Sequence, residues 1–202
     1  MSLQLLGSRT SPFVRQVRVT ALEKGLGEAL PLRETNPFEN DPALLAANPL
    51  GKVPALVGTP LGTLHDSRLL CEYIDSLRPE PPLLPRDGGA RWAVLRRQAT
   101  AVGIMDAAAA HVMEARRDDG AISAHWQQRR EQAMARGAAA LAADFAQDGF
   151  ALDLGSIATA VALAYLDFRH PQVEWRRAHA ALAAWVDDFA QRPSMTASAP
   201  PA

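Results

Sequence analysis

Two short stretches of this sequence combine residues that cap or turn the chain with groups that a small polar ligand can use. Asp66-Ser67 directly precedes an apolar segment with helical spacing, and the free N–H groups of a helix start can bind a carboxylate. Val53 precedes Pro54, so it favours extended geometry, in which its N–H and C=O can pair with a ligand like an edge strand. Pro54 is also a candidate for a cis peptide bond. Taken singly, each stretch is more simply explained as a cap or a turn.

The order of these residues carries more information than each residue alone. NPLGKVPAL, a short hairpin and HDS follow one another between Asn48 and Ser67, and this order resembles the glutathione site of the cytosolic glutathione S-transferase family. In that family, the residue before a cis-proline pairs with the cysteinyl backbone of glutathione. An acidic residue followed by serine holds the γ-glutamyl end. The resemblance extends along nearly the whole chain, and it implies these roles for Val53 and for Asp66-Ser67.

The resemblance also implies that the turn from Gly7 to Phe13 faces the glutathione sulfur. From the residues alone, Ser11 before Pro12 is an N-cap followed by proline at the first helical position. In related classes, including those with Cys-Pro-Phe at this point, the residue before the proline faces the sulfur. A serine can donate to a thiolate but cannot form a mixed disulfide, which favours conjugation or peroxidase chemistry over thiol transfer. Thr10 and Ser8 are alternatives in the same loop.

Such a site acts by lowering the pKa of the bound thiol. A free thiol has a pKa near 8.5, and each unit of lowering requires about 1.4 kcal/mol of preferential stabilisation of the anion. One hydroxyl donor together with the N–H groups of a helix start is of the right order for about one to two units.

The resemblance thus implies a set of glutathione-binding residues in which Ser11 is the catalytic residue. The set is Ser11, Phe13, Lys52, Val53, Pro54, Asp66 and Ser67. Lys52 can reach the glycine carboxylate of glutathione or be a solvated turn lysine. Glutathione is the expected cosubstrate, and no metal is expected. The sequence contains no P-loop, GxGxxG, GxSxG or HExxH motif that indicates another chemistry.

Hydrophobic periodicity predicts an α/β domain at residues 1–78 and an all-helical domain at residues 90–202. In the first domain we expect the order β-α-β-(α)-β-β-α, a thioredoxin-like fold whose first two strands are parallel. The expected elements are strands at 3–6 and 30–33, a helix at 12–24, a short helix at 43–47, a hairpin at 55–65 and a helix at 67–77. Four prolines and two glycines indicate a linker at 79–89.

The second domain is rich in alanine and gives no strand signal. We expect helices at about 90–117, 121–147, 154–169 and 175–190, followed by a loose tail rich in Pro, Ala and Ser. Members of the resembled family carry a Ser/Thr-x-x-Asp capping box at the buried helix of this domain. Here Ser156 is followed by Thr159 where the acid is expected, so we expect Ser156 to cap the helix with a weaker partner.

Composition limits the partners and the compartment. Lys and Arg number 21 against 22 Asp and Glu, giving a net charge of −1, so charge gives no indication of a nucleic-acid partner. Cys71 is the single cysteine, which excludes a disulfide framework within the chain and fits a reducing compartment. We found no signal peptide and no run of about 18 apolar residues. A cytoplasmic protein without membrane association is therefore expected.

The functional hypothesis is a homodimeric transferase that binds glutathione, stabilises its thiolate and adds it to an electrophilic small molecule; the dimer follows from the resemblance only. One alternative is a catalytically silent interaction module with the same fold. Another is a glutathione-dependent isomerase or dehalogenase. The second substrate is not predicted, because pocket shape rather than periodicity determines it.

Overall fold

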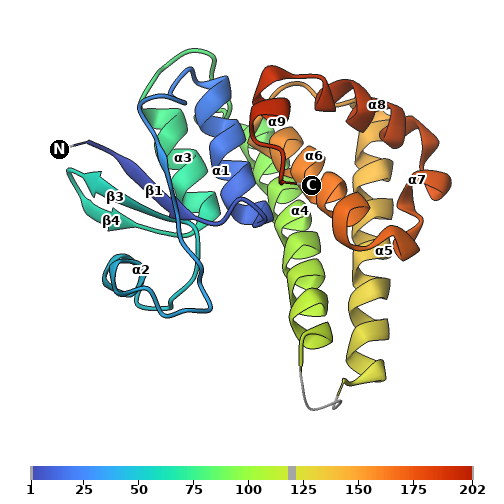
Figure 1. Cartoon of the computed structure of the whole chain (residues 1–202). Helices are drawn as coiled ribbons and strands as arrows, with labels where there is room; N and C mark the ends of the chain where they lie inside the picture. The colour runs from blue at the N-terminus through green and yellow to red at the C-terminus, as the bar shows by residue number, and fades with distance from the viewer. Residues whose placement is uncertain (1, 118–121, 202) are drawn as a thin grey trace. The chain divides into compact units, whose positions relative to one another are not determined.

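The computed structural model describes residues 2–117 and 122–201, and the chain divides into two compact units. One unit combines residues 1–86 with 192–202, and the other contains residues 87–191. The first unit has a small mixed sheet with helices, and the second is helical in the part that the structure describes (Figure 1). The predicted fold class, an α/β domain of thioredoxin-like type followed by a helical domain, is therefore confirmed.

The sheet of the first unit has the strand order β2-β1-β3-β4. Its strands are β1 (Gln4–Gly7), β2 (Leu32–Glu34), β3 (Ala55–Thr59) and β4 (Gly62–Leu64). β1 and β2 are parallel, as predicted, whereas β3 is antiparallel to both β1 and β4. The second strand begins two residues later than expected, because the Leu30 N–H is bonded to Gly27 O in the preceding turn and pairing with β1 starts at Leu32.

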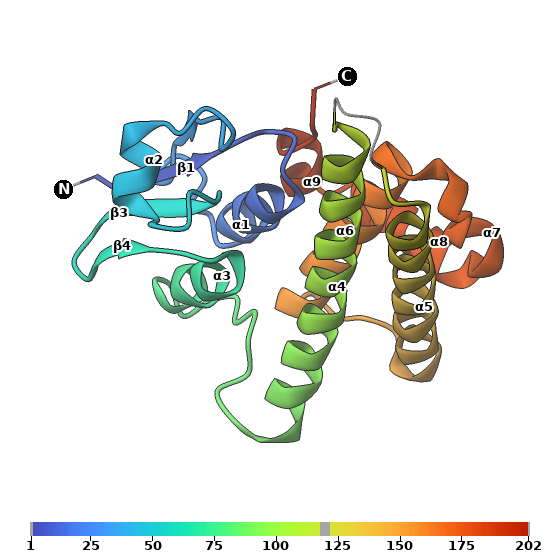
Figure 2. The same cartoon turned by 90° about the horizontal axis from the view of Figure 1, so that it is seen from below.

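Helices cover both faces of this sheet. They are α1 (Pro12–Glu23), α2 (Pro42–Ala47) and α3 (Ser67–Ser76). α1 packs along α3 on one face, and α2 lies on the other (Figures 1 and 2). On the α2 face, Leu6 and Ala55 form a buried cluster with Leu44 and Ala47. The alternation of side chains along a strand turns their neighbours in β1 and β3 towards α1 and α3.

The C-terminal tail is ordered, so the expectation of a loose tail is wrong. Pro193–Ala197 forms the short helix α9, which packs against α1 within the first unit. The Arg192 guanidinium donates two hydrogen bonds of 2.8 Å to the Glu23 carboxylate. Arg15 also donates to the Met195 carbonyl at 3.1 Å. These contacts join positions about 170 residues apart, which local composition does not reveal.

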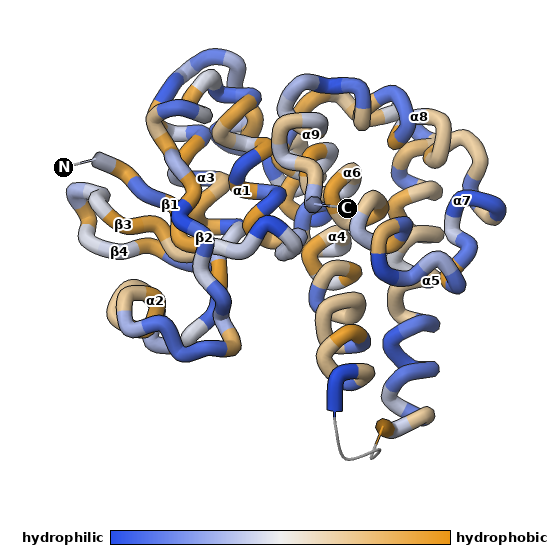
Figure 3. The backbone as a smooth tube through the Cα atoms, viewed as in Figure 1, coloured by the Kyte–Doolittle hydropathy of each residue, from blue (hydrophilic) through white to orange (hydrophobic). Residues whose placement is uncertain are grey.

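The second unit is a set of packed helices. They are α4 (Gly88–Ala115), α5 (Ala124–Asp148), α6 (Leu154–Arg169), the 3-10 turn η1 (Pro171–Val173), α7 (Trp175–Ala178) and α8 (Ala180–Ala190). α4 packs against α5 and α6, and most residues of α6 are buried, whereas the first turns of α5 are hydrophilic (Figure 3). No described helix has the length and hydropathy needed to span a bilayer.

Two details of this unit differ from the sequence prediction. The helix expected at 175–190 is divided into α7 and α8, because His179 leaves helical geometry with φ −137° and ψ 62°. Residue 121, where we expected the preceding helix to begin, lies outside the described residues; α5 starts at Ala124.

The cap of α6 is also placed differently from the prediction. Asp153, not Ser156, is the N-cap, and its Oδ1 accepts from the Ser156 N–H at 2.7 Å. The Ser156 hydroxyl accepts in return from the Asp153 N–H at 2.9 Å. The reciprocal box is complete one turn earlier than expected, because an aspartate at the N-cap accepts the free N–H groups as well as a serine does.

Candidate functional site

The register of the sheet brings the three predicted stretches to one end of it. Leu6, near the end of β1, pairs with Ala55, the first residue of β3. Leu56 pairs with Leu64, the last residue of β4. The loop that leads from β1 into α1, the segment before β3 and the segment between β4 and α3 therefore meet at the same sheet end. Polar groups from these three segments can reach one bound molecule.

Ser11 is the N-cap of α1, and its hydroxyl keeps a proton that it can donate. Its Oγ accepts from the Val14 N–H at 3.4 Å, which is long for a hydrogen bond. Since a hydroxyl has one donor as well as its acceptor lone pairs, capping leaves the O–H of Ser11 available. Pro12 and Phe13 follow as the first two helical residues, with Pro12 buried and Phe13 half-buried. The first turn of α1 has no acidic residue, so its positive end is not neutralised there.

The two alternative hydroxyls of this loop bond to each other. Ser8 Oγ and Thr10 Oγ1 are 3.1 Å apart, and the Thr10 N–H also points at Ser8 Oγ at 3.4 Å. Thr10 is exposed, whereas Ser11 is half-buried at the helix start. Of the three hydroxyls, Ser11 alone caps α1 and stands at the positive end of its dipole. Ser11 is therefore the hydroxyl of this loop that lies at the start of α1, where an anion is favoured.

The peptide bond between Val53 and Pro54 is cis. The sequence indicated Pro54 as a candidate for such a bond. Val53 is half-buried, and no backbone hydrogen bond joins it to another residue in the part of the chain that the structure describes. Its N–H and C=O are thus available to an extended ligand. Lys52 is exposed and forms no ion pair among the described residues. Its ammonium is open to an anionic ligand and equally to water.

Asp66 is the N-cap of α3, and its two carboxylate oxygens have different environments. Oδ1 accepts from the Arg68 and Leu69 N–H groups at 3.0 and 3.3 Å. Oδ2 lies 3.5 Å from the Arg68 guanidinium, and both side chains are more than half exposed. Ser67 is 3% exposed, and its hydroxyl has no hydrogen-bond partner among the described residues. One oxygen therefore caps the helix, while the other and the Ser67 hydroxyl remain available.

Two residues near these segments were not identified from the sequence as parts of a site. Arg68 forms the ion pair with Asp66 just described. Asn48, the first residue of the NPLGKVPAL stretch, was given no role of its own, and it donates to the Lys52 carbonyl at 2.7 Å. The position of Asn48, at the end of an apolar helix and four residues before Lys52, could have indicated this bond. Asparagine side chains often bond to backbone groups a few residues away.

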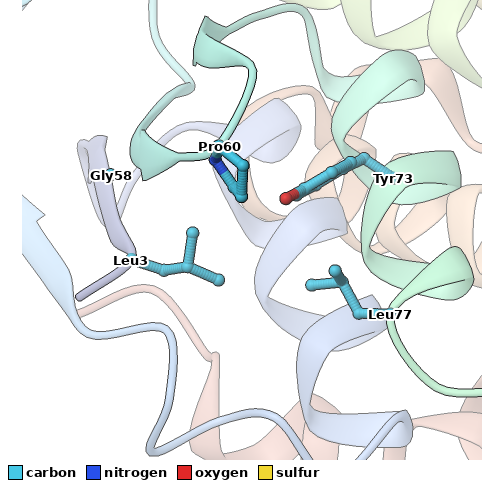
Figure 4. Close-up of a pocket in the computed structure, with 5 residues that line it drawn as sticks. All are labelled: Leu3, Gly58, Pro60, Tyr73 and Leu77. Carbon is cyan, nitrogen blue, oxygen red and sulfur yellow. The ribbon is translucent and has the colours of Figure 1, made fainter. Parts of the chain in front are cut away.

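A different hollow lies at the opposite end of β3. Leu3, Gly58, Pro60, Tyr73 and Leu77 line it, and its volume is about 450 Å³. Figure 4 shows the side chains of Leu3, Pro60, Tyr73 and Leu77 around a common space, with the Tyr73 hydroxyl directed into it. Because Gly58 and Pro60 lie at or beyond the last residues of β3, this hollow is separate from the segments that precede β3. Its lining lacks a charged group.

Metal binding has no candidate ligand set here. Among the described residues, no group of three His, Cys, Asp or Glu side chains is arranged to hold a metal ion.

Comparison with known proteins covers both units. The model of the glutathione S-transferase N-terminal domain matches residues 5–82, and that of the glutathione S-transferase C-terminal domain matches residues 101–188. The uncharacterized GST-like protein YibF of Escherichia coli K12 is 33% identical over 203 residues, covering 98% of this chain and 99% of that protein.

Solved structures give the same relationship. A glutathione transferase family member from Pseudomonas fluorescens Pf-5 with bound glutathione is 40% identical, covers 100% of both chains and superposes with a TM-score of 0.92. A glutathione S-transferase from Methylobacillus flagellatus KT with glutathione bound is 34% identical and has a TM-score of 0.87, covering 99% of this chain and 100% of the other.

Proposed function

The chain belongs to the glutathione S-transferase family, and from this we propose that it binds glutathione, stabilises its thiolate at Ser11 and transfers it to an electrophilic small molecule. The observation that carries the proposal is that groups still able to bind a ligand meet at one sheet end. These are the Ser11 O–H, the Val53 backbone, the Ser67 hydroxyl and the outer oxygen of Asp66. The glutathione bound in similar solved structures supports the same ligand.

Each group matches one part of glutathione. The Val53 N–H and C=O pair with the cysteinyl main chain, as an added strand pairs with a sheet edge. Asp66 Oδ2 accepts from the γ-glutamyl ammonium in place of Arg68, and the hydroxyl and N–H of Ser67, at the positive end of α3, bind its carboxylate. Lys52 pairs with the glycine carboxylate. Phe13 and Pro54 provide apolar contact beside the ligand.

Ser11 then acts on the sulfur. Its O–H donates to the thiolate while the N–H groups at the start of α1 add positive potential. Both interactions favour the anion, so the thiol loses its proton to solvent near neutral pH. With a haloarene as electrophile, the sulfur forms a bond to the ring carbon and halide leaves with its electron pair. Peroxidase chemistry can begin from the same thiolate.

The first test is a calorimetric titration with reduced glutathione. We expect wild-type protein to bind in the micromolar to millimolar range and Asp66→Ala to lose saturable binding. Turnover of a chlorodinitrobenzene, followed by halide release, should then depend on Ser11, with Ser11→Ala as the comparison. If wild-type protein gives no heat and no saturation at several millimolar glutathione, the catalytically silent interaction module becomes the better description. Binding without Ser11-dependent turnover of any electrophile favours the same reading.

We also propose a cytoplasmic homodimer. Its support is the family resemblance together with exposed apolar side chains on the first unit, Leu61 at 73%, Leu69 at 48% and Leu77 at 40%, which a second copy would cover. The free thiol Cys71 fits a reducing compartment. Sedimentation of wild-type protein and of Leu61→Glu tests the dimer; a wild-type mass of one chain at micromolar concentration contradicts it.

A further inference from the structure

Asn48 is a buried polar residue whose two side-chain hydrogen bonds both lead to the segment before Val53. It is 3% exposed and terminates α2, with its N–H bonded to the Leu44 carbonyl at 2.7 Å. Its side-chain Oδ1 accepts from the Leu50 N–H at 3.0 Å, and its Nδ2 donates to the Lys52 carbonyl at 2.7 Å. Its own carbonyl accepts from the Gly51 N–H at 2.9 Å. The side chain therefore closes the turn between α2 and Val53.

Only a carboxamide satisfies both ends of this turn. One end presents an N–H and needs an acceptor, and the other presents a carbonyl and needs a donor. Aspartate has the same shape but offers lone pairs to both ends. Alanine offers neither group and leaves the Leu50 N–H and the Lys52 C=O to water.

The bond to Lys52 O acts on Val53, because a carbonyl and the following N–H belong to one planar unit. In a trans peptide these two groups point in opposite directions. By holding the Lys52 carbonyl, Asn48 turns the Val53 N–H to the side away from itself. The same bond polarises the peptide and strengthens that N–H as a donor.

The turn is itself anchored in the core. Leu44 and Ala47 of α2 pack with Leu6 and Ala55 of the sheet, and Val53 packs against this cluster. Asn48 therefore extends from a fixed helix end to the one peptide that precedes Val53. An unanchored peptide between Gly51 and Pro54 could rotate and misdirect its N–H.

We propose that Asn48 is a positioning residue for glutathione: it orients the Lys52–Val53 peptide so that the Val53 N–H meets the cysteinyl main chain of the ligand. This inference rests on the proposed function. Asn48 touches neither the sulfur nor the second substrate. Its role is therefore in affinity for glutathione, while the pKa of the bound thiol depends on Ser11.

The test compares Asn48→Asp and Asn48→Ala with Asp41→Ala. Asp41 caps the other end of α2, accepting from the Ala43 N–H at 2.8 Å, so its loss loosens the same helix without touching Lys52. Asn48→Ala carries no charge and so separates peptide orientation from any effect of a new carboxylate on Lys52. The measurements are the dissociation constant of glutathione by calorimetry, thermal unfolding, and the rate at saturating glutathione against pH.

Asn48→Asp should weaken glutathione binding about tenfold or more, the equivalent of one lost hydrogen bond. Asn48→Ala should weaken it by about threefold to tenfold, whereas Asp41→Ala should change it less than about twofold. For both Asn48 variants, the rate at saturation and the pH at which it reaches half its maximum should stay at wild-type values.

Three results overturn the inference. They are unchanged glutathione affinity in both Asn48 variants, an equal loss of affinity in Asp41→Ala at equal loss of thermal stability, and a shifted pH profile. If Asn48→Asp does not fold, Asn48→Ala and Asp41→Ala give the same comparison. Failure of wild-type protein to bind glutathione is a different result, since it refutes the proposed function itself.

Discussion

Asp153 and Asp66 both cap helices in this protein, but the second carboxylate oxygen of each has a different environment. At the start of α6, Asp153 Oδ1 accepts a hydrogen bond from the Ser156 N–H at 2.7 Å. Its Oδ2 forms an ion pair with the Arg97 guanidinium at 3.0 Å, and the Asp153 side chain is 15% exposed. Asp66, at the start of α3, caps with one oxygen and leaves the other facing Arg68 and solvent, with its side chain 59% exposed. In sequence, both are simply an aspartate before a helix.

The difference shows how a cap that only stabilises can be distinguished from one that can also bind. Both oxygens of Asp153 are occupied by partners within its own unit, so no ligand can reach them without breaking a bond. The Oδ2 atom of Asp66 can release Arg68 and water and accept a hydrogen bond from the ammonium group of a ligand. A helix start is thus a candidate site when capping leaves a group that is exposed and can exchange its partner for a ligand.

The largest expected effect is on stability, at Asp153. Asp153→Ala removes the cap of a buried helix and leaves the Arg97 charge, 13% exposed, without its carboxylate. We expect a loss of about 3 kcal/mol in the free energy of unfolding. The same change at Asp66 should cost about 1 kcal/mol. Urea unfolding of the two variants measures both; equal losses would show that the second carboxylate oxygen of Asp153 contributes nothing.

The second expected effect is on binding, at Asp66. Asp66→Ser keeps an N-cap hydroxyl for α3 but removes the charge and the second oxygen, so stability should stay within about 0.5 kcal/mol of wild type. Glutathione affinity should fall about tenfold to a hundredfold, as expected for a lost hydrogen bond to a charged group. Calorimetry gives the affinity and thermal unfolding gives the stability. Full glutathione affinity in this variant would mean that Asp66 is a cap only, like Asp153.

The sequence predicted those parts of the fold that local signals determine. Ser11-Pro12 and Asp66-Ser67 are caps, and a cap fixes where a helix begins. The Val53-Pro54 turn and the hairpin after it were identifiable for the same reason, because proline and glycine restrict the backbone locally.

The contacts that were missed join distant positions or choose between equivalent groups. The order of the tail depends on Arg192 finding Glu23, far away in sequence. The cap of α6 depended on a choice between two good capping residues, Asp153 and Ser156, which propensity alone does not decide. The role of Asn48 depends on which carbonyl lies within its reach. Tertiary packing supplies this information.

Ser11 is a third helix cap to compare with Asp153 and Asp66, and it carries no charge. Its hydroxyl accepts from Val14 at 3.4 Å and still has a proton to donate. Ser11→Ala should raise the pKa of bound glutathione by about one unit, equal to about 1.4 kcal/mol of lost thiolate stabilisation. Turnover at neutral pH should drop about tenfold and recover at alkaline pH, because more thiol then ionises without help.

The measurement for Ser11 is a pH titration of thiolate absorbance in the complex, with Ser11→Thr as the control that keeps a hydroxyl. Thr10→Ala is the matched variant in the same loop and should leave the titration unchanged. If the pKa of bound glutathione shifts in Thr10→Ala and not in Ser11→Ala, Thr10 rather than Ser11 donates to the sulfur.

The smallest expected effect concerns Cys71, whose thiol has no role in the proposed site. It is 0% exposed, and burial raises the pKa of its thiol to about 12. The folded state therefore keeps the proton that the unfolded chain releases above a pKa near 8.5, so the contribution of Cys71 to stability is full well below pH 8.5 and decreases as pH rises. At about pH 9 the loss is about 0.8 kcal/mol. Unfolding of wild type and Cys71→Ala at several pH values isolates this contribution, since all other titrating groups are shared. If the difference between the two proteins does not vary between pH 8 and 10, the Cys71 thiol ionises as easily in the folded protein as in the unfolded chain.

A half-exposed hydroxyl at a helix start, as at Ser11, should thus stabilise a thiolate, whereas full burial, as at Cys71, should oppose it.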